Sequence, residues 1–212
     1  YLGHHGEDAG NAYRFVFTHH VPLFFLLSGC AEYITDEKRL MVTVKKTFQG
    51  ILLPWLFFCV TALVFFTVQH NISYGGVFSR LKTIAAGTIR NEYFAGTVWF
   101  LTCIAVVRIA FAIIKKVRFK IVIFLICFAS FLCAQYLMNP HPTSKPSWIY
   151  NIDSAIYYIV YYAIGYVLFP YINKALNPQT IMGKLSLFAS LLISFVYAAL
   201  RFWGEDPLSI FS

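Results

Sequence analysis

The chain has 212 residues, of which 59% are hydrophobic, 19% aromatic and only 12% charged, and its formal net charge is +8. Soluble domains carry roughly 25% charged residues, so this chain holds too few to cover a soluble domain of its size. The composition excludes disordered, collagen-like and disulfide-scaffold chains. It predicts an all-α, polytopic bundle of transmembrane helices. The positive charge is interpreted as loop topology, and no nucleic acid is expected as a partner.

Long apolar stretches predict the membrane spans, because a helix needs about 20 residues to cross roughly 30 Å of hydrocarbon. Six full spans are expected, over residues 15–33, 51–69, 97–114, 121–138, 154–172 and 185–203. Tyr1-Leu2-Gly3 resembles the tail of a preceding helix, and the chain stops soon after the sixth span. We therefore expect a single membrane domain over residues 1–212, as a fragment truncated at both ends.

Basic residues concentrate in alternate loops. Ten of the 17 Lys and Arg residues follow the first, third and fifth predicted spans: Lys38, Arg39, Lys45, Lys46, Lys115, Lys116, Arg118, Lys120, Lys174 and Lys184. The positive-inside bias predicts that these loops are cytoplasmic. The chain is expected to be a multi-pass protein of the bacterial inner membrane. Segment 70–96 also carries basic residues, but long loops weigh less in this bias. Gly75-Gly76 and Gly87 break up that loop, which is expected to contain a short surface helix on the membrane face.

The five cysteines all lie within apolar runs, and none forms a Cys-x-x-Cys pair: Cys30, Cys59, Cys103, Cys127 and Cys133. A disulfide framework or a zinc site would place them in loops at fixed spacings. We interpret them as small buried apolar side chains and expect no metal site.

Two histidine pairs lie near the start of the chain. His4-His5 follows the apparent helix tail, and His19-His20 opens the first full span. Since only a short polar loop separates the two helices, both pairs are expected at one end of a helical hairpin. Histidine titrates closest to neutral pH, which suits it to proton transfer. Metal binding and simple packing at headgroup depth are the alternatives.

Arg108 lies inside the predicted span 97–114. An arginine at mid-span costs about 2.5–3.5 kcal/mol, so it requires an explanation. In the expected orientation it lies about six residues, or roughly 9 Å, from the cytoplasmic end. Either it snorkels to the headgroups, or it faces the bundle and binds an anionic ligand such as a nucleotide phosphate.

The fifth span carries two rows of tyrosines at helical spacing, formed by Tyr158, Tyr162 and Tyr166 and by Tyr157 and Tyr161. Helix packing explains them, and a wall facing a sugar is the alternative. Asp153, at the mouth of that span, either accepts a hydrogen bond from a substrate hydroxyl or belongs to a solvated helix start. Trp99, at the outer start of the third span, is expected as an interfacial anchor or a stacking surface for a sugar.

Five short motifs occur in order along the chain: Tyr1-Leu2-Gly3-His4; His20-Val21-Pro22-Leu23-Phe24-Phe25-Leu26-Leu27-Ser28-Gly29; Lys45-Lys46 followed by Leu52-Leu53-Pro54-Trp55; Trp99-Phe100-Leu101; and Pro146-Ser147-Trp148 through Asp153 to Gly165-Tyr166. Together they resemble the acyltransferase 3 family of integral membrane acyltransferases, especially its fucose-4-O-acetylase-like branch. The resemblance implies a larger helical bundle that moves an acyl group, often acetyl from acetyl-CoA, onto a sugar hydroxyl.

The resemblance also implies site residues. His4 matches the histidine thought to be catalytic, with His5 as the alternative if the register shifts by one, and His20 matches a second histidine. The arginine that the family pairs with the first histidine would lie before Tyr1. Thr47 and Gln49 stand where some members carry further arginines.

Acyl transfer needs a base for the alcohol proton, a donor for the oxyanion and two aligned substrates. We expect His4 to act as the base, while His20 orients it or stabilises the oxyanion. No Gly-x-Ser-x-Gly elbow is present, which favours direct transfer.

Acyl-CoA is the expected donor, and its candidate contacts are Arg108, Lys45 and Lys46, although topology alone also explains the lysines. Trp99 and Asp153 are the candidates for binding the glycan acceptor. A permease or flippase for a lipid-linked glycan is the alternative function, and it does not require a histidine pair.

Overall fold

The computed structural model describes residues 10–70, 73–88, 98–138, 142, 148–177 and 179–202, and of residues 10–20, 182 and 198–202 it describes the backbone alone. The described residues form helices and turns, with no strand among them, so the all-α prediction is confirmed. In chain order the elements are α1 (Gly10–Thr35), α2 (Leu40–Thr47), the π-helical turn η3 (Phe48–Leu52), α3 (Leu53–His70), α4 (Tyr74–Ala86), α5 (Trp99–Ile114), α6 (Lys120–Tyr136), the 3-10 turn η6 (Ile149–Asn151), α7 (Ile152–Ala175) and α8 (Ile181–Phe202).

Two helical runs of the described chain are long and apolar enough to cross a membrane. They are Leu40–His70, which joins α2, η3 and α3, and Ile149–Ala175, which joins η6 and α7. The other four predicted spans correspond to shorter apolar stretches with described side chains: Val21–Thr35, Trp99–Ile114, Lys120–Tyr136 and Gly183–Tyr197. Of the six predicted full spans, two are therefore long and apolar enough among the described residues. Helix α5 begins at Trp99, after Val98, and α6 ends at Tyr136, before Leu137, so both are shorter than predicted.

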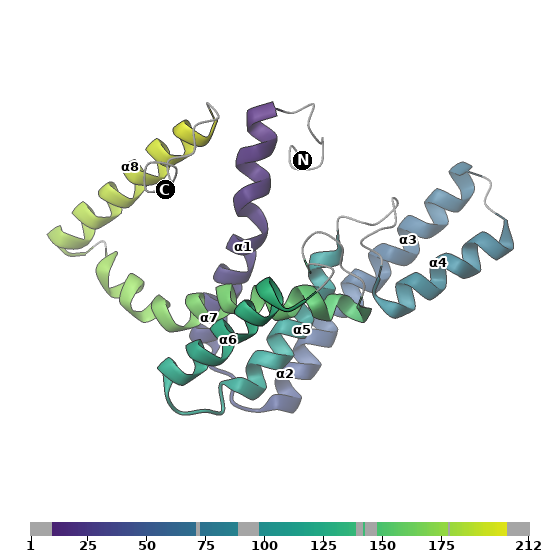
Figure 1. The fold of residues 1–212 in the computed structure, drawn as a ribbon, viewed down its shortest axis with the longest axis horizontal. Coiled ribbons are helices and arrows are strands. Elements are labelled where there is room, and N and C mark those ends of the chain that lie inside the picture. Colours follow the sequence, from purple (N-terminus) through teal and green to yellow (C-terminus); the bar gives the residue numbers. More distant parts are fainter. Residues whose placement is uncertain are drawn as a thin grey trace.

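Helix α7 is the centre of the arrangement. It packs against α1, α6 and α5, and Figure 1 shows it crossing the middle of the molecule with α1 rising from it. The main apolar core lies among these four helices and includes Phe25, Phe111 and Tyr162, all fully buried. The ring of Phe25 stacks on Tyr158 with their centroids 4.8 Å apart.

A pair of glycines sets the closeness of α1 and α7. A Cβ built on Gly29 would lie 2.0 Å from the carbonyl oxygen of Tyr162, and one on Gly165 would lie 2.0 Å from that of Leu26. No larger side chain fits either gap, so the two backbones are in direct contact. Small residues permit such close crossings of apolar helices. Both glycines belong to motifs that carry the family resemblance, Ser28-Gly29 and Gly165-Tyr166.

Helices α3 and α4 form a hairpin beside this core. Trp55, Cys59 and Leu63 of α3 bury Ile84 of α4. The short helix expected within segment 70–96 is thus present as α4, but Gly75 and Gly76 lie inside its first turn. The hydroxyl of Ser73 caps that turn by accepting the Gly76 N–H, which is why the glycines do not break it.

The outer faces of the helices are largely apolar. Exposed side chains include Phe57, Phe65 and Val68 on α3, Ile121 and Leu125 on α6, and Phe188, Leu191 and Phe195 on α8. Apolar patches of this extent mark contact with a membrane or another protein.

The cysteines fit the prediction in part. Cys59, Cys103 and Cys127 are buried, Cys30 is half-buried and Cys133 is exposed, and all five are free thiols.

Candidate functional site

Three polar side chains lie close to the buried carboxylate of Glu32, near the end of α1. The Glu32 side chain is 2% exposed. Its Oε2 accepts a hydrogen bond of 3.3 Å from the Tyr162 hydroxyl and lies 3.7 Å from Nε of Arg108. Its Oε1 accepts a hydrogen bond from the Lys115 ammonium group. Each oxygen of one carboxylate therefore faces its own cation.

The positions of these residues along α1 and α5 explain why their side chains meet. Glu32 follows Gly29 by one turn, so the close crossing of α1 and α7 sets its approach to Tyr162. Arg108 and Lys115 are seven residues apart at the end of α5, which places them on one face of the helix, two turns apart. Glu32 lies between them.

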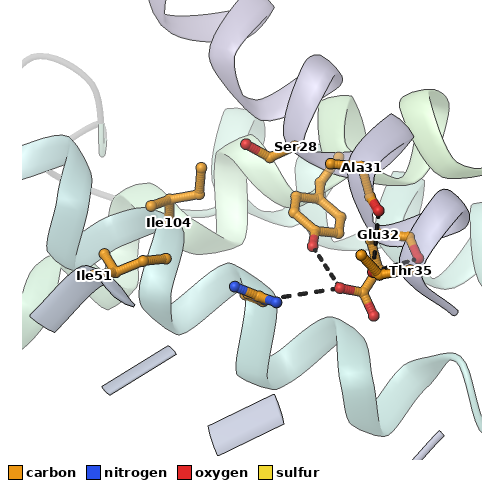
Figure 2. A pocket seen from close by; sticks show the side chains of 8 residues that line it. Ser28, Ala31, Glu32, Thr35, Ile51 and Ile104 are labelled. Carbon is orange, nitrogen blue, oxygen red and sulfur yellow. Dashed lines mark hydrogen bonds and ion pairs between the residues drawn. The ribbon is translucent and has the colours of Figure 1, made fainter. Parts of the chain in front are cut away.

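A cavity of about 140 Å³ opens beside this cluster (Figure 2). Its lining comes from α1, η3, α5 and α7: Ser28, Ala31, Glu32, Thr35, Ile51, Ile104, Arg108 and Tyr162. The Arg108 side chain is 24% exposed, whereas that of Glu32 is 2% exposed. Of the two charged residues that line the cavity, Arg108 therefore has the more exposed side chain.

A second cavity has a volume of about 310 Å³. We call it the outer cavity and the first one the inner cavity. The outer cavity is lined by Asp36, Lys38, Ala112, Lys115, Lys116 and Tyr166. Lys115 lines this outer cavity while it pairs with Glu32 of the inner one. The connections after α1 and after α5 thus meet at one end of the molecule, as Figure 1 also shows.

The connection between α1 and α2 is organised by Glu37. Its carboxylate accepts the backbone N–H of Arg39 at 3.2 Å and pairs with the Lys46 ammonium group at 3.2 Å. The Arg39 N–H first, and then Lys46, hold the pKa of Glu37 below its ordinary value. Of the two lysines expected to bind the donor, Lys46 is thus in an ion pair and Lys45 is exposed.

The expected acceptor residues have structural partners. Asp153 is buried, and its carboxylate accepts the backbone N–H groups of Trp148 and Ser154, so it does not lie in a solvated helix start. Trp99 is half-buried at the start of α5, with its ring 6.1 Å from that of Tyr158. Both residues help to fix the junction of α5 and α7.

Asn151 is the centre of that junction. It adopts a left-handed conformation with φ of 55°, and its buried amide donates to the carbonyl oxygen of Gly87 at 3.1 Å and to the Thr102 hydroxyl at 2.9 Å. It thereby ties the end of α4 and the start of α5 to the start of α7.

The tyrosines of α7 confirm the packing interpretation. Tyr158 and Tyr162 are buried in the main core, and Tyr157 and Tyr161 contact the ring of Phe131 on α6.

The histidines expected to act in catalysis are only partly located. His4 and His5 lie outside the described residues, and of His20 only the backbone in α1 is described. His20 precedes Glu32 by twelve residues, which is about 18 Å along a helix. Within the described part of the chain, no three His, Cys, Asp or Glu side chains gather where a metal ion could bind.

Sequence reasoning missed Glu32. It is the one acidic residue of the predicted span 15–33. An acid in one span and Arg108 in another form the pairing that buried membrane charges need. For Arg108, the structure supplies a partner that neither snorkelling nor ligand binding anticipated, an internal carboxylate.

Comparisons of the chain with models of known protein families, with curated proteins and with solved structures find no match.

Proposed function

We propose that this chain belongs to an integral membrane O-acyltransferase, which moves an acetyl or other acyl group from acyl-CoA to a sugar hydroxyl of a cell-surface or lipid-linked glycan. The observation that carries the proposal is the cavity at the end of α1, where Arg108 is open to an anion beside the outer lysine-lined cavity. The same helix carries His20, about 18 Å away. Coenzyme A bears its charges at one end of a long flexible arm and its thioester at the other, which suits this separation.

Membrane placement has its own support. The most apolar window of Leu40–His70 is only 17% buried, whereas the core helix of a soluble protein is mostly buried. The backbones of α1 and α8 extend over 26 and 22 residues, enough for roughly 39 and 33 Å. We therefore retain a multi-pass topology with six spans in the bacterial inner membrane, with the connections after α1, α5 and α7 in the cytoplasm.

The proposed chemistry is direct transfer. The neutral imidazole of His4 accepts the proton of the sugar hydroxyl as its oxygen attacks the thioester carbonyl, and coenzyme A leaves as the thiol. His20 orients that imidazole or stabilises the oxyanion. Arg108 holds a phosphate of the donor, and Lys45 and Lys46 add to the attraction.

The two acceptor candidates have different support. Trp99 is partly exposed, and we propose that its ring stacks on the sugar. Asp153 is buried and holds backbone N–H groups, so we propose that it supports the acceptor side only by fixing the start of α7.

The test uses membranes that contain the full-length protein and acetyl-CoA labelled in the acetyl group. Label is expected in the glycan with the wild-type protein and is expected to be lost with His4→Ala. His70→Ala is the matched control, because His70 is exposed at the end of α3 and contacts only the ring of Phe66 within the described residues. An unaltered yield of acetylated glycan with a well-expressed His4→Ala protein contradicts the proposal.

A permease or flippase for a lipid-linked glycan is the second candidate. The buried Glu32–Arg108 pair favours it, since charges inside a bundle also line transport pathways. A transporter moves the glycan in vesicles without acetyl-CoA and leaves the glycan unlabelled.

A further inference from the structure

The charges around the inner cavity do not cancel. Arg108 and Lys115 supply two positive charges, and Glu32 is the single acid paired with both. Lys115 is 7% exposed and donates a hydrogen bond to Glu32, so this cation is paired. Arg108 is only 3.7 Å from Glu32 through Nε, and within the described chain its guanidinium makes no hydrogen bond. Its two terminal amino groups, which together form the fork that binds phosphate, are free for a ligand.

The lining of the outer cavity also carries more positive than negative charges. Lys38, Lys115 and Lys116 line it against the single acid Asp36. Lys115 lines the outer cavity and Glu32 the inner one, so the ion pair between them connects the two linings. A cavity of roughly 150 Å³ in a protein can hold a benzene-sized molecule, so the inner cavity accepts one phosphate-sized group and the larger outer cavity the neighbouring atoms.

We propose that Glu32 is an internal counter-ion that competes with a phosphate group for Arg108 and Lys115, and that the two cavities form one binding site for a phosphate-bearing ligand. Without a ligand, Glu32 neutralises Lys115, which is the more buried of the two cations. A phosphate that binds at Arg108 adds a second negative charge beside both cations. The choice of coenzyme A as the ligand rests on the proposed function, whereas the phosphate site does not.

The proposed competition predicts whether each mutation raises or lowers the affinity for phosphate. Glu32→Gln keeps the shape of the side chain but raises the local charge from +1 to +2, so affinity for phosphate is expected to rise about tenfold. Lys115→Met lowers the local charge to zero and is expected to weaken binding about tenfold. If Glu32 bound or positioned the ligand directly, Glu32→Gln would weaken phosphate binding instead.

The experiment is a titration of the full-length protein in nanodiscs of phosphatidylcholine, followed by calorimetry, with coenzyme A and inorganic pyrophosphate as separate probes. Arg118→Leu is the matched control, since it removes one exposed charge from the connection after α5 but lines neither cavity, and it is expected to change either affinity less than twofold. The thermal midpoint of each variant reports whether it is folded.

Unchanged or weaker binding by a folded Glu32→Gln protein overturns the proposal. If that variant does not fold, Lys116→Met decides, because an exposed lysine of the outer cavity can be removed without breaking the buried pair. Wild-type affinity in Lys116→Met then overturns it. Loss of coenzyme A binding when phosphatidylglycerol is added to the discs assigns the site to a lipid headgroup instead. Pyrophosphate binding without acetyl transfer would reject the proposed function alone.

Discussion

Glu32 shows how one buried side chain can organise a site. A carboxylate removed from water is costly, and it is tolerated here because two cations and the Tyr162 hydroxyl face its two oxygens. Deleting one partner of a buried ion pair commonly costs 3–5 kcal/mol, because the other charge remains buried without compensation. The cluster thus constrains both stability and the charge that Arg108 presents to the inner cavity.

Arg108 provides a prediction at this scale. Under the proposed function, Arg108→Leu in the full-length protein is expected to raise the apparent KM for acetyl-CoA by roughly tenfold or more, because the proposed charge-assisted contact to phosphate would be lost. Arg118→Leu, which removes an exposed cation from the nearby connection, is the control. An unchanged KM in Arg108→Leu would mean that the guanidinium serves only the pairing with Glu32.

Glu37 provides a prediction about pH. Its pKa is lowered in the folded protein, so its contacts add stability above its ordinary pKa, and this contribution is lost as pH falls through the folded value. Thermal midpoints of wild type and Glu37→Gln, measured across acidic pH, are therefore expected to converge as the pH falls below 4.5. A gap that widens on acidification would contradict this assignment.

At the scale of elements, the crossing of α1 and α7 depends on the absence of two side chains. Gly29 and Gly165 let each backbone touch the other, which brings Glu32 and Tyr162 within hydrogen-bond distance. Both positions face backbone atoms, so the neighbours cannot move aside as a flexible side chain could.

Gly165→Ala is accordingly expected to destabilise the protein by several kcal/mol, in the upper range for an overpacked core, and to weaken acetyl-CoA binding by separating the helices. Gly50→Ala is the matched control, because nothing lies within 4 Å of a Cβ built at Gly50 in its helical turn. Alanine there is expected to be neutral or to stabilise by about 0.5–1 kcal/mol. Thermal unfolding of both variants in detergent checks the pair, and equal midpoints would show that the crossing tolerates a methyl group.

The junction held by Asn151 belongs to the same scale. Asn151→Ala removes two buried hydrogen bonds, so unfolding should become easier by about 1–3 kcal/mol. The exposed Asn177, whose side-chain oxygen accepts the N–H of Gln179, is the comparison, and its alanine variant should be close to neutral. A mild effect of Asn151→Ala would show that α4, α5 and α7 are joined mainly by apolar packing.

At the scale of the whole molecule, apolar faces surround a bundle in which the basic connections after α1 and α5 meet at one end. The proposed topology places Lys38 and Lys116 in the cytoplasm and Tyr74, exposed at the start of α4, on the opposite side. In whole cells expressing a cysteine-free protein, a membrane-impermeant thiol reagent should label Tyr74→Cys but neither Lys38→Cys nor Lys116→Cys until the membrane is opened. Labelling of all three in intact cells would reject the orientation.

The sequence by itself determined that the chain is helical and apolar, and it located most of the helices, because composition and hydrophobic runs are local properties. It also identified Arg108 as a costly charge within a predicted span. It could not identify Glu32 as the partner of that charge, since Glu32 lies 83 residues from Lys115 and 130 from Tyr162 along the chain. Only the crossing of α1 and α7, with α5 beside it, joined these residues around a cavity, because pairing between distant helices depends on close packing that no single segment encodes.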